Sequence, residues 1–159
     1  DHVAGQAWGR KGANKYLLDR VNDRMDIVRT MDEITEMTLR YPKARTKLIE
    51  DKANGPAVIQ MLKRKISGLI AVNPEGGKVV RASAVIPDIE AGNVYLPHPT
   101  IAPWVEGFVN TFAGFPKVAK DDDVDSLTQA LNRLMYNTSQ QDQYEQYEEY
   151  EPAFGRTGY

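Results

Sequence analysis

A short apolar run that ends in two acids and precedes a proline most constrains the fold of this chain. Thr46 to Glu50 has the length of a short strand with Leu48 and Ile49 at its centre, and DKANG after it is a polar turn. Pro56 stands where a helix can begin, because proline lacks the amide hydrogen that the first helical turn leaves unused. AVIQMLKRK continues at helical spacing, and GLIAV supplies another strand. The region therefore predicts a strand, helix, strand unit of an α/β domain.

The segments on either side of this unit extend the α/β pattern. Val3 to Trp8 and Lys15 to Val21 predict two strands, with GRKGAN between them as a hairpin turn. Apolar residues at helical spacing from Ile27 to Tyr41 predict a helix that ends before Pro42. NVYLP predicts a short strand. We expect further helices in KVVRASAVIPDIEAG, bent or interrupted at Pro87, in IAPWVEGFVNTFAGF and in DDDVDSLTQALNRLMY. An initial hairpin followed by alternating helices and strands predicts a mixed sheet.

Composition excludes several classes of protein. The absence of cysteine among the 159 residues excludes disulfides and thiolate-bound metals. The 20 basic and 22 acidic residues give a net charge of -2, so any contact with DNA requires a local basic patch. No apolar run reaches the ~20 residues of a membrane span, and the opening DHVAGQAW lacks a secretory signal. We expect an intracellular domain that is part of a longer protein and makes no membrane contact.

The last part of the chain differs from the rest in composition. From residue 137 to residue 159 there are almost no aliphatic side chains but many Gln, Glu and Tyr, which cannot bury enough apolar surface to pack. We expect one domain over residues 1–136 and a polar, flexible tail over residues 137–159. Tyr144, Tyr147 and Tyr150 recur at every third residue, which is compatible with a docking motif, although this composition favours a solvated tail.

Glu50 and Asp51 form the first candidate site. A carboxylate at the carboxyl end of a strand in an α/β sheet points into the crevice where such folds bind ligands. The alternative is an acidic turn in which Asp51 or Asn54 caps the following helix, and the residues alone favour that alternative.

The second candidate site is the run Asp121, Asp122, Asp123 and Asp125. On a helix, Asp121 or Asp122 shares a face with Asp125. Acids in a first helical turn also cap free amides and interact favourably with the helix dipole, so both interpretations stay open. Together the two acidic sites suit Mg²⁺ or Mn²⁺, which carboxylates bind, and pairs of such ions ~4 Å apart hydrolyse phosphodiesters.

Other site chemistries have little support in the sequence. His2 and His98 have no partner at ligand spacing, which argues against a zinc enzyme, and the phosphate loop GxxxxGK[ST] and the GxSxG motif are absent. Basic residues at turns and helix ends either line a phosphate-binding surface or serve solubility; they are Arg10, Lys11, Lys52, Lys63, Arg64, Lys65, Lys78 and Arg81.

Four long blocks of the chain resemble successive blocks of phage terminase large subunits: KYLLDRVNDRMDI, KLIEDKANGPAVIQ, NPEGGKVVRASAVIPDIEAGNVYLP and FPKVAKDDDVDSLTQAL. The resemblance covers about residues 1 to 135. It implies a ribonuclease H-like α/β fold with a mixed central sheet flanked by helices, whose first strand lies upstream of this chain. It also implies a nuclease that cuts concatemeric DNA with Mg²⁺ or Mn²⁺, as two ions.

The resemblance assigns roles to particular acids. Glu50 corresponds to the family's later-strand acid, Asp121 and Asp122 to the paired acids that open the final helix, and Asp125 to the acid one turn on. The leading aspartate of the family is expected upstream, on the first strand, and Asp1 corresponds to a non-catalytic residue. Lys120 stands where the family commonly has histidine; a protonated lysine cannot ligate metal but can contact a phosphate.

The sequence thus predicts a metal-dependent endonuclease with Glu50, Asp121, Asp122 and Asp125 at the metals, and with Lys52, Lys78, Arg81 and Lys120 on DNA. The resemblance implies further partners: the portal protein, the small terminase subunit and an ATPase domain in the same polypeptide, acting at the procapsid in the host cytoplasm. One alternative is a non-catalytic module that docks on DNA or the portal. Another is a junction resolvase or transposase of the same fold, which would share the acids.

Overall fold

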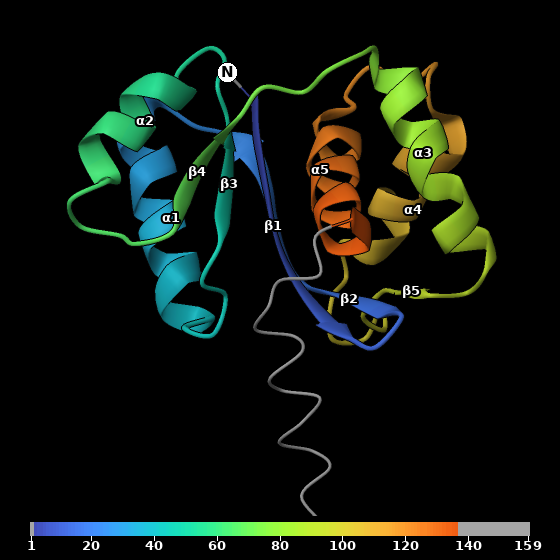
Figure 1. Cartoon of the computed structure of the whole chain (residues 1–159). Coiled ribbons are helices and arrows are strands. Elements are labelled where there is room, and N and C mark those ends of the chain that lie inside the picture. Colours follow the sequence, from blue (N-terminus) through green and yellow to red (C-terminus); the bar gives the residue numbers. More distant parts are fainter. Residues whose placement is uncertain (1, 137–159) are drawn as a thin grey trace, which may run out of the picture.

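A long antiparallel hairpin opens the structure. The computed structural model describes residues 2–136, and in it β1 (His2–Lys11) pairs with β2 (Asn14–Arg24) (Figure 1). The connection is a two-residue turn in which Gly12 has φ 59°, a conformation that glycine adopts without a steric penalty. The register shifts between Ala7 and Trp8. The predicted hairpin is confirmed.

The predicted strand, helix, strand unit is also present. β3 (Lys47–Glu50) and β4 (Leu69–Val72) pair in parallel, and α2 (Gly55–Leu62) connects them with Pro56 in its first turn. α2 ends before the predicted KRK because the chain turns back at this point to bury Ile66 beside Leu62. The preceding helix, α1 (Ile27–Arg40), ends two residues before Pro42 and is capped at its start by Asp26, whose side chain accepts from Arg29 N.

Three helices and one short strand complete the described chain. They are α3 (Lys78–Glu90), β5 (Val94–Tyr95), α4 (Val105–Gly114) and α5 (Asp122–Tyr136). α3 runs through Pro87 without interruption, contrary to one form of the prediction. Pro87 has no amide hydrogen to donate to the carbonyl of Ser83, four residues earlier in the helix. Ser83 is exposed, so water can take the place of that hydrogen bond. β5 pairs in parallel with β2, and Tyr95 stacks on Tyr16 with ring centroids 4.9 Å apart.

The strands form a mixed sheet in two hydrogen-bonded parts. One part has the order β1-β2-β5 and contains both antiparallel and parallel pairs; the other is the parallel pair β3-β4. Within residues 2–136, β1 and β3 each have strand partners on one side only. The expected α/β class with a mixed sheet is confirmed.

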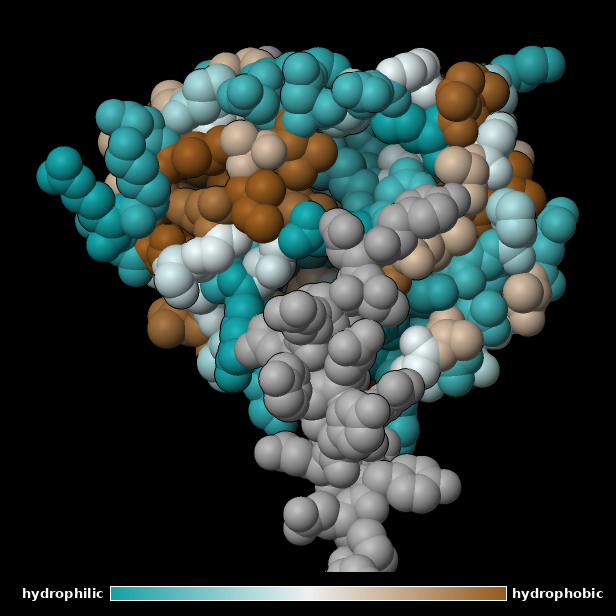
Figure 2. Space-filling view, in the orientation of Figure 1, coloured by the Kyte–Doolittle hydropathy of each residue, from teal (hydrophilic) through white to brown (hydrophobic). Residues whose placement is uncertain are grey.

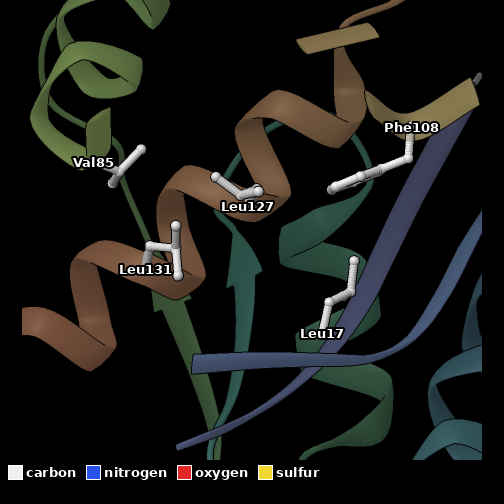
Figure 3. Packing of buried hydrophobic residues seen from close by; sticks show 5 residues of the cluster. All are labelled: Leu17, Val85, Phe108, Leu127 and Leu131. Carbon is white, nitrogen blue, oxygen red and sulfur yellow. The ribbon is translucent and has the colours of Figure 1, made fainter. Parts of the chain in front are cut away.

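Each part of the sheet has its own core. Leu17, Val85, Phe108, Leu127 and Leu131 fill the larger core, where α3, α4 and α5 pack with the hairpin (Figure 3). Val58, Leu62 and Ile66 fill the smaller core between α2, α1 and the inner face of β3 and β4. The larger core contains aliphatic and aromatic side chains and the smaller core only aliphatic ones and a methionine, and burial of these groups is the main stabilising contribution in each.

The outer face of the β3-β4 sheet is apolar and open. Ile49 and Leu69 contribute to the smaller core, so the alternate positions Leu48 and Ile70 point to the opposite face. Figure 2 shows hydrophobic side chains gathered over β3 and β4 on this side, and Ile70 is 36% exposed. In the part of the chain that the structure describes, no helix is both long and apolar enough to cross a membrane.

Candidate functional site

Acidic residues gather at one end of the fold. β3 and β4 end at Glu50 and Val72, and the amino ends of α3 and α5 lie at the same, upper end in Figure 1. Of the predicted site residues, Asp122 and Asp125 are in the first turn of α5, Asp121 immediately precedes it, and Glu50 is the last residue of β3. The topology therefore places both acidic clusters at the carboxyl end of the parallel strands, which is where α/β folds bind ligands.

Asp121 and Asp125 already hold a cationic group between them. Lys78 Nζ is 2.6 Å from Asp121 Oδ1 and 2.8 Å from Asp125 Oδ2, and Arg81 Nη2 is 2.6 Å from Asp125 Oδ1. Both bases lie in the first turns of α3, so these contacts join α3 to α5. The ammonium group of Lys78 occupies a position between two carboxylates that a metal cation could also take.

The carboxylates around Lys78 raise its pKa. Burial acts against the charged form, but hydrogen bonds to Asp121 and Asp125 and the charges of these carboxylates outweigh it, so the pKa is raised above its usual value. Lys78 is therefore protonated at neutral pH and balances the acids in the absence of another cation.

Asp122 differs from its neighbours. Its side chain is half-buried, and among residues 2–136 no hydrogen bond or ion pair engages its carboxylate. A carboxylate without a protein partner retains its full capacity to bind a hard cation. Asp122 is therefore the acid of this cluster most available to a ligand.

Asp123 is the structural member of the run. It is 2% exposed, and its carboxylate accepts hydrogen bonds from Arg20 Nε at 3.0 Å and from Asn22 Nδ2 at 2.7 Å. Gln6 Nε2 donates to the backbone oxygen of Asp123 at 3.1 Å, and the guanidinium of Arg20 also lies 5.6 Å from the ring centroid of Trp104. This network ties the first turn of α5 to both strands of the hairpin.

The network around Asp123 was not identified from the sequence. Arg20 and Asn22 lie two residues apart on β2, and Gln6 pairs with Arg20 in register, so a polar row on one face of the hairpin was readable. Nothing in the spacing indicated that a residue 101 positions away from Asn22 would complete it.

Glu50 is held by a tight turn. Its carbonyl oxygen leaves no room for a side chain at Gly55, whose added Cβ would overlap it, and Asp51 N donates to Val72 O at 2.7 Å. Ala53 has φ 48°, so the turn contains a strained residue. The Glu50 carboxylate itself is half-buried and lies 3.1 Å from Lys52 Nζ.

The capping alternatives receive limited support. Asn54 occupies the N-cap of α2 but makes no side-chain capping hydrogen bond. At α5, the backbone oxygen of Asp121 accepts from Val124 N at 2.9 Å, while its side chain accepts from Lys78. The acids of the first turn still interact favourably with the helix dipole.

The donor set fits a hard divalent cation in kind. All candidate ligands are carboxylate oxygens, which Mg²⁺ and Mn²⁺ prefer, and one of them lacks a partner among the described residues. Among residues 2–136, however, no three acidic or histidine side chains converge closely enough to form a complete metal site. Glu50 lies on β3 and the aspartates lie on and just before α5, so the candidate ligands come from two elements.

The residues predicted to contact DNA differ in whether an acid already pairs with them. Lys78 and Arg81 are engaged by the acids of α5, and Lys52 by Glu50. Lys120 is exposed just before Asp121, and His98 lies in an exposed loop, where Thr100 N donates to its Nδ1. The role of these bases on DNA stays a prediction.

A comparison with known families decides what this arrangement belongs to. The family model described as the terminase RNaseH-like domain matches residues 1–134. The chain belongs to this family. The match includes the hairpin, both acidic clusters and nearly all of α5, and it confirms the ribonuclease H-like fold of a phage terminase nuclease-type domain. No curated protein matches the chain.

Proposed function

We propose that this terminase domain is a metal-dependent endonuclease that cuts concatemeric double-stranded DNA during genome packaging. The observation that carries the proposal is the unengaged carboxylate of Asp122 beside a cation-holding pair of acids, at the end of the fold where β3 delivers Glu50. Membership in the terminase family supports the reaction class.

The chain's own residues have distinct tasks in this proposal. Glu50, Asp121, Asp122 and Asp125 supply oxygen ligands for Mg²⁺ or Mn²⁺, as two ions. Such a pair of ions activates the attacking water and stabilises the leaving oxygen in phosphodiester hydrolysis. Asp123 positions the first turn of α5 through its contacts with Arg20 and Asn22, so that Asp122 is held in one orientation.

Lys78 competes with metal in this site. Because its ammonium group bridges Asp121 and Asp125, a cation between these acids requires Lys78 to move outward. The displaced ammonium would then be free to contact a phosphate of the substrate. We expect Lys78→Gln to increase the affinity for Mn²⁺ in calorimetry, because the variant removes the competing charge. A decrease would show that Lys78 does not compete with the metal.

We also propose that a further strand completes the sheet and supplies another acid. The support is the single-sided pairing of β1 and β3, which are terminal strands of two separate parts of the sheet in the described residues. A strand that pairs with both would join the two parts and add a ligand near Glu50. On this proposal residues 1–136 form the nuclease domain without that strand.

Plasmid nicking in Mn²⁺ tests the proposed activity, in a longer polypeptide that includes the residues preceding Asp1. Glu50→Gln and Asp122→Asn each remove one charged ligand, and we expect cutting to fall by at least about 100-fold, the scale of losing one preorganised charge stabilisation. Asp51→Asn is the matched control, because Asp51 is an exposed acid adjacent to Glu50. Undiminished cutting by Asp122→Asn would reject its assignment.

A non-catalytic docking module is the second candidate. It is favoured by the lack of three convergent acids among the described residues. On this alternative the domain contacts DNA or the portal, with the ATPase domain in the same polypeptide and the small subunit as neighbours at the procapsid in the host cytoplasm. Calorimetry with Mn²⁺ separates the two candidates. An endonuclease site binds Mn²⁺, and this binding is lost in Asp122→Ala, whereas a docking module binds no Mn²⁺ specifically.

A further inference from the structure

Six basic side chains lie on the two segments that lead into β3 and β4, away from the end of β3 that carries Glu50. They come from the segment that enters β3 and from the loop between α2 and β4, and we call them the amino-end basic surface: Lys43, Arg45, Lys47, Lys63, Arg64 and Lys65. All are exposed except Lys47, which is half-buried at the first position of β3. Because β3 and β4 are parallel, both segments lie at the same, lower end of these strands (Figure 1).

The two segments are held together by their backbones. Lys47 N donates to Gly68 O at 2.8 Å, and Lys47 Nζ donates to Ser67 O at 3.1 Å. Gly68 has φ 78° and lies so close to the carbonyl oxygen of Arg45 that no side chain would fit there. Ile66, which is 8% exposed, anchors the loop in the smaller core. The cations therefore project from a defined frame.

In the described part of the chain, no acid pairs with these charges. The sequence contains no Asp or Glu from Tyr41 to Ile49 or from Gly55 to Pro74. Within residues 2–136, none of the six cations forms an ion pair with a carboxylate. In a chain with a net charge of -2, these two adjoining segments carry only positive charge. Segments of this kind attract anionic partners.

We propose that the amino-end basic surface binds the phosphate backbone of double-stranded DNA. The surface would be a second contact, separate from the catalytic end. The inference relies on the proposed function for the identity of the polyanion. The exposed hydroxyl groups of Thr46 and Ser67 lie among the cations, and lysine, arginine and hydroxyl groups together are the usual donors to phosphate oxygens. Phosphate contacts of this kind carry no sequence information, so the proposed contact has no sequence preference.

The dimensions suit one duplex contacting both ends of the unit. β3 extends over four residues, so its two ends are ~10 Å apart at about 3.3 Å per residue. Each strand of DNA carries one phosphate per ~3.4 Å of helix axis, so a duplex alongside β3 presents about three phosphates per strand over that length. Backbone contact at the basic surface would thus fix the duplex relative to Glu50.

Fluorescence anisotropy with a labelled 20-base-pair duplex of mixed sequence tests the proposal. The measurements use the full chain in EDTA, where no cutting occurs, over a range of salt concentrations. Each phosphate contact contributes ~0.9 to the slope of log affinity against log salt. We expect the slope to become shallower by about 3 in Lys63→Gln/Arg64→Gln/Lys65→Gln and by about 2 in Lys43→Gln/Arg45→Gln.

A matched control changes the same net charge elsewhere. Arg24→Gln/Arg29→Gln/Lys117→Gln removes three exposed cations outside the surface and is expected to leave the slope unchanged. Equal losses in control and test variants would overturn the proposal, because they would reflect net charge alone. Thermal unfolding followed by circular dichroism verifies that each variant is folded, and the two-residue variant provides an independent test if the loop variant is not.

Two further results separate the possible interpretations. If a labelled peptide of residues 137–159, which is rich in Glu, loses affinity for the loop variant while duplex binding is unchanged, the surface serves an acidic polypeptide and the proposal fails. If the slopes change as expected but the longer polypeptide does not cut DNA in Mn²⁺, the basic surface stands and the proposed nuclease activity fails.

Discussion

At the scale of single residues, two adjacent acids in the first turn of α5 differ in role: one stabilises the fold and the other is available to a ligand. Asp123 is buried and satisfied by the hairpin, whereas Asp122 has no engaged partner in the part of the chain that the structure describes. A site ligand must be free to bind its cation, while a buried carboxylate must be neutralised by donors. The two residues should therefore respond differently to the same substitution.

Asp123→Ala is expected to lower the free energy of unfolding by about 3 to 5 kcal/mol, because it leaves the guanidinium of Arg20 without its buried partner. Asp122→Ala should change it by no more than about 0.5 kcal/mol, since no contact is lost. Urea denaturation at pH 7 measures both. Similar values for the two variants would contradict the division of tasks.

The raised pKa of Lys78 predicts that the folded protein loses stability at alkaline pH. Its pKa is raised in the folded state, so the folded protein binds this proton more tightly than the unfolded chain does. The resulting stabilisation is fully present below the unfolded pKa of 10.5 and disappears as the pH rises through the higher folded value. Because Lys78 is partly exposed, the effect should be under about 1 kcal/mol.

The comparison of Lys78→Met with wild type at pH 8 and pH 11 isolates this contribution. Urea midpoints should differ most at pH 8, and the difference should be smaller at pH 11, above the unfolded pKa, while tyrosine ionisation affects both proteins alike. Lys117→Met, which removes an exposed lysine, serves as the control and should show a pH-independent difference. A Lys78→Met difference of the same size at pH 8 and pH 11 would show that packing, rather than charge, stabilises this contact.

At the scale of elements, most of the secondary structure followed from local signals. The sequence alone predicted the two-residue turn at Gly12, the end of α1 before Pro42 and the beginning of α2 at Pro56. Each of these depends on the backbone properties of a single residue. The continuity of α3 through Pro87 did not follow, because it depends on the solvent exposure of Ser83. The acids were recognised as candidates, but the partners of Asp121, Asp123 and Asp125 are tertiary contacts without a local pattern.

The turn between β3 and α2 depends on Gly55. In Gly55→Ala the new Cβ would overlap the carbonyl oxygen of Glu50, which is backbone and cannot move cheaply. We expect destabilisation of about 1 to 3 kcal/mol, as for other overpacked sites. Gly107→Ala in α4 is the matched control, because its Cβ meets nothing within 4 Å; it should stabilise by about 0.5 to 1 kcal/mol. Thermal unfolding compares them, and equal effects would reject the close approach at Glu50.

At the scale of the whole molecule, the two cores predict two levels of stability. The smaller core has three buried residues, and the structure places it around α2, β3 and β4. Native-state hydrogen exchange should show amides of this unit opening at a lower free energy than amides of α5 and β2.

Two substitutions make this prediction specific. Leu62→Ala should lower the opening free energy of the β3-α2-β4 unit by about 2 to 5 kcal/mol and leave the amides of α5 nearly unchanged. Leu131→Ala, in the larger core, should lower the protection of all elements, because the smaller unit is not expected to persist alone. A uniform effect of both variants would show that the domain unfolds in a single step.

The parallel pairing of β3 and β4 also separates charge along the molecule. Lysines and arginines lie where these strands begin, and Glu50 and the aspartates of α5 lie at the end where they finish. Within residues 2–136, most of these acids are ion-paired while the bases at the opposite end are not, so an approaching polyanion attracts the basic end more strongly before contact. The domain would therefore turn its basic end toward DNA during diffusion, and this orientation should weaken as the Debye length shortens with added salt.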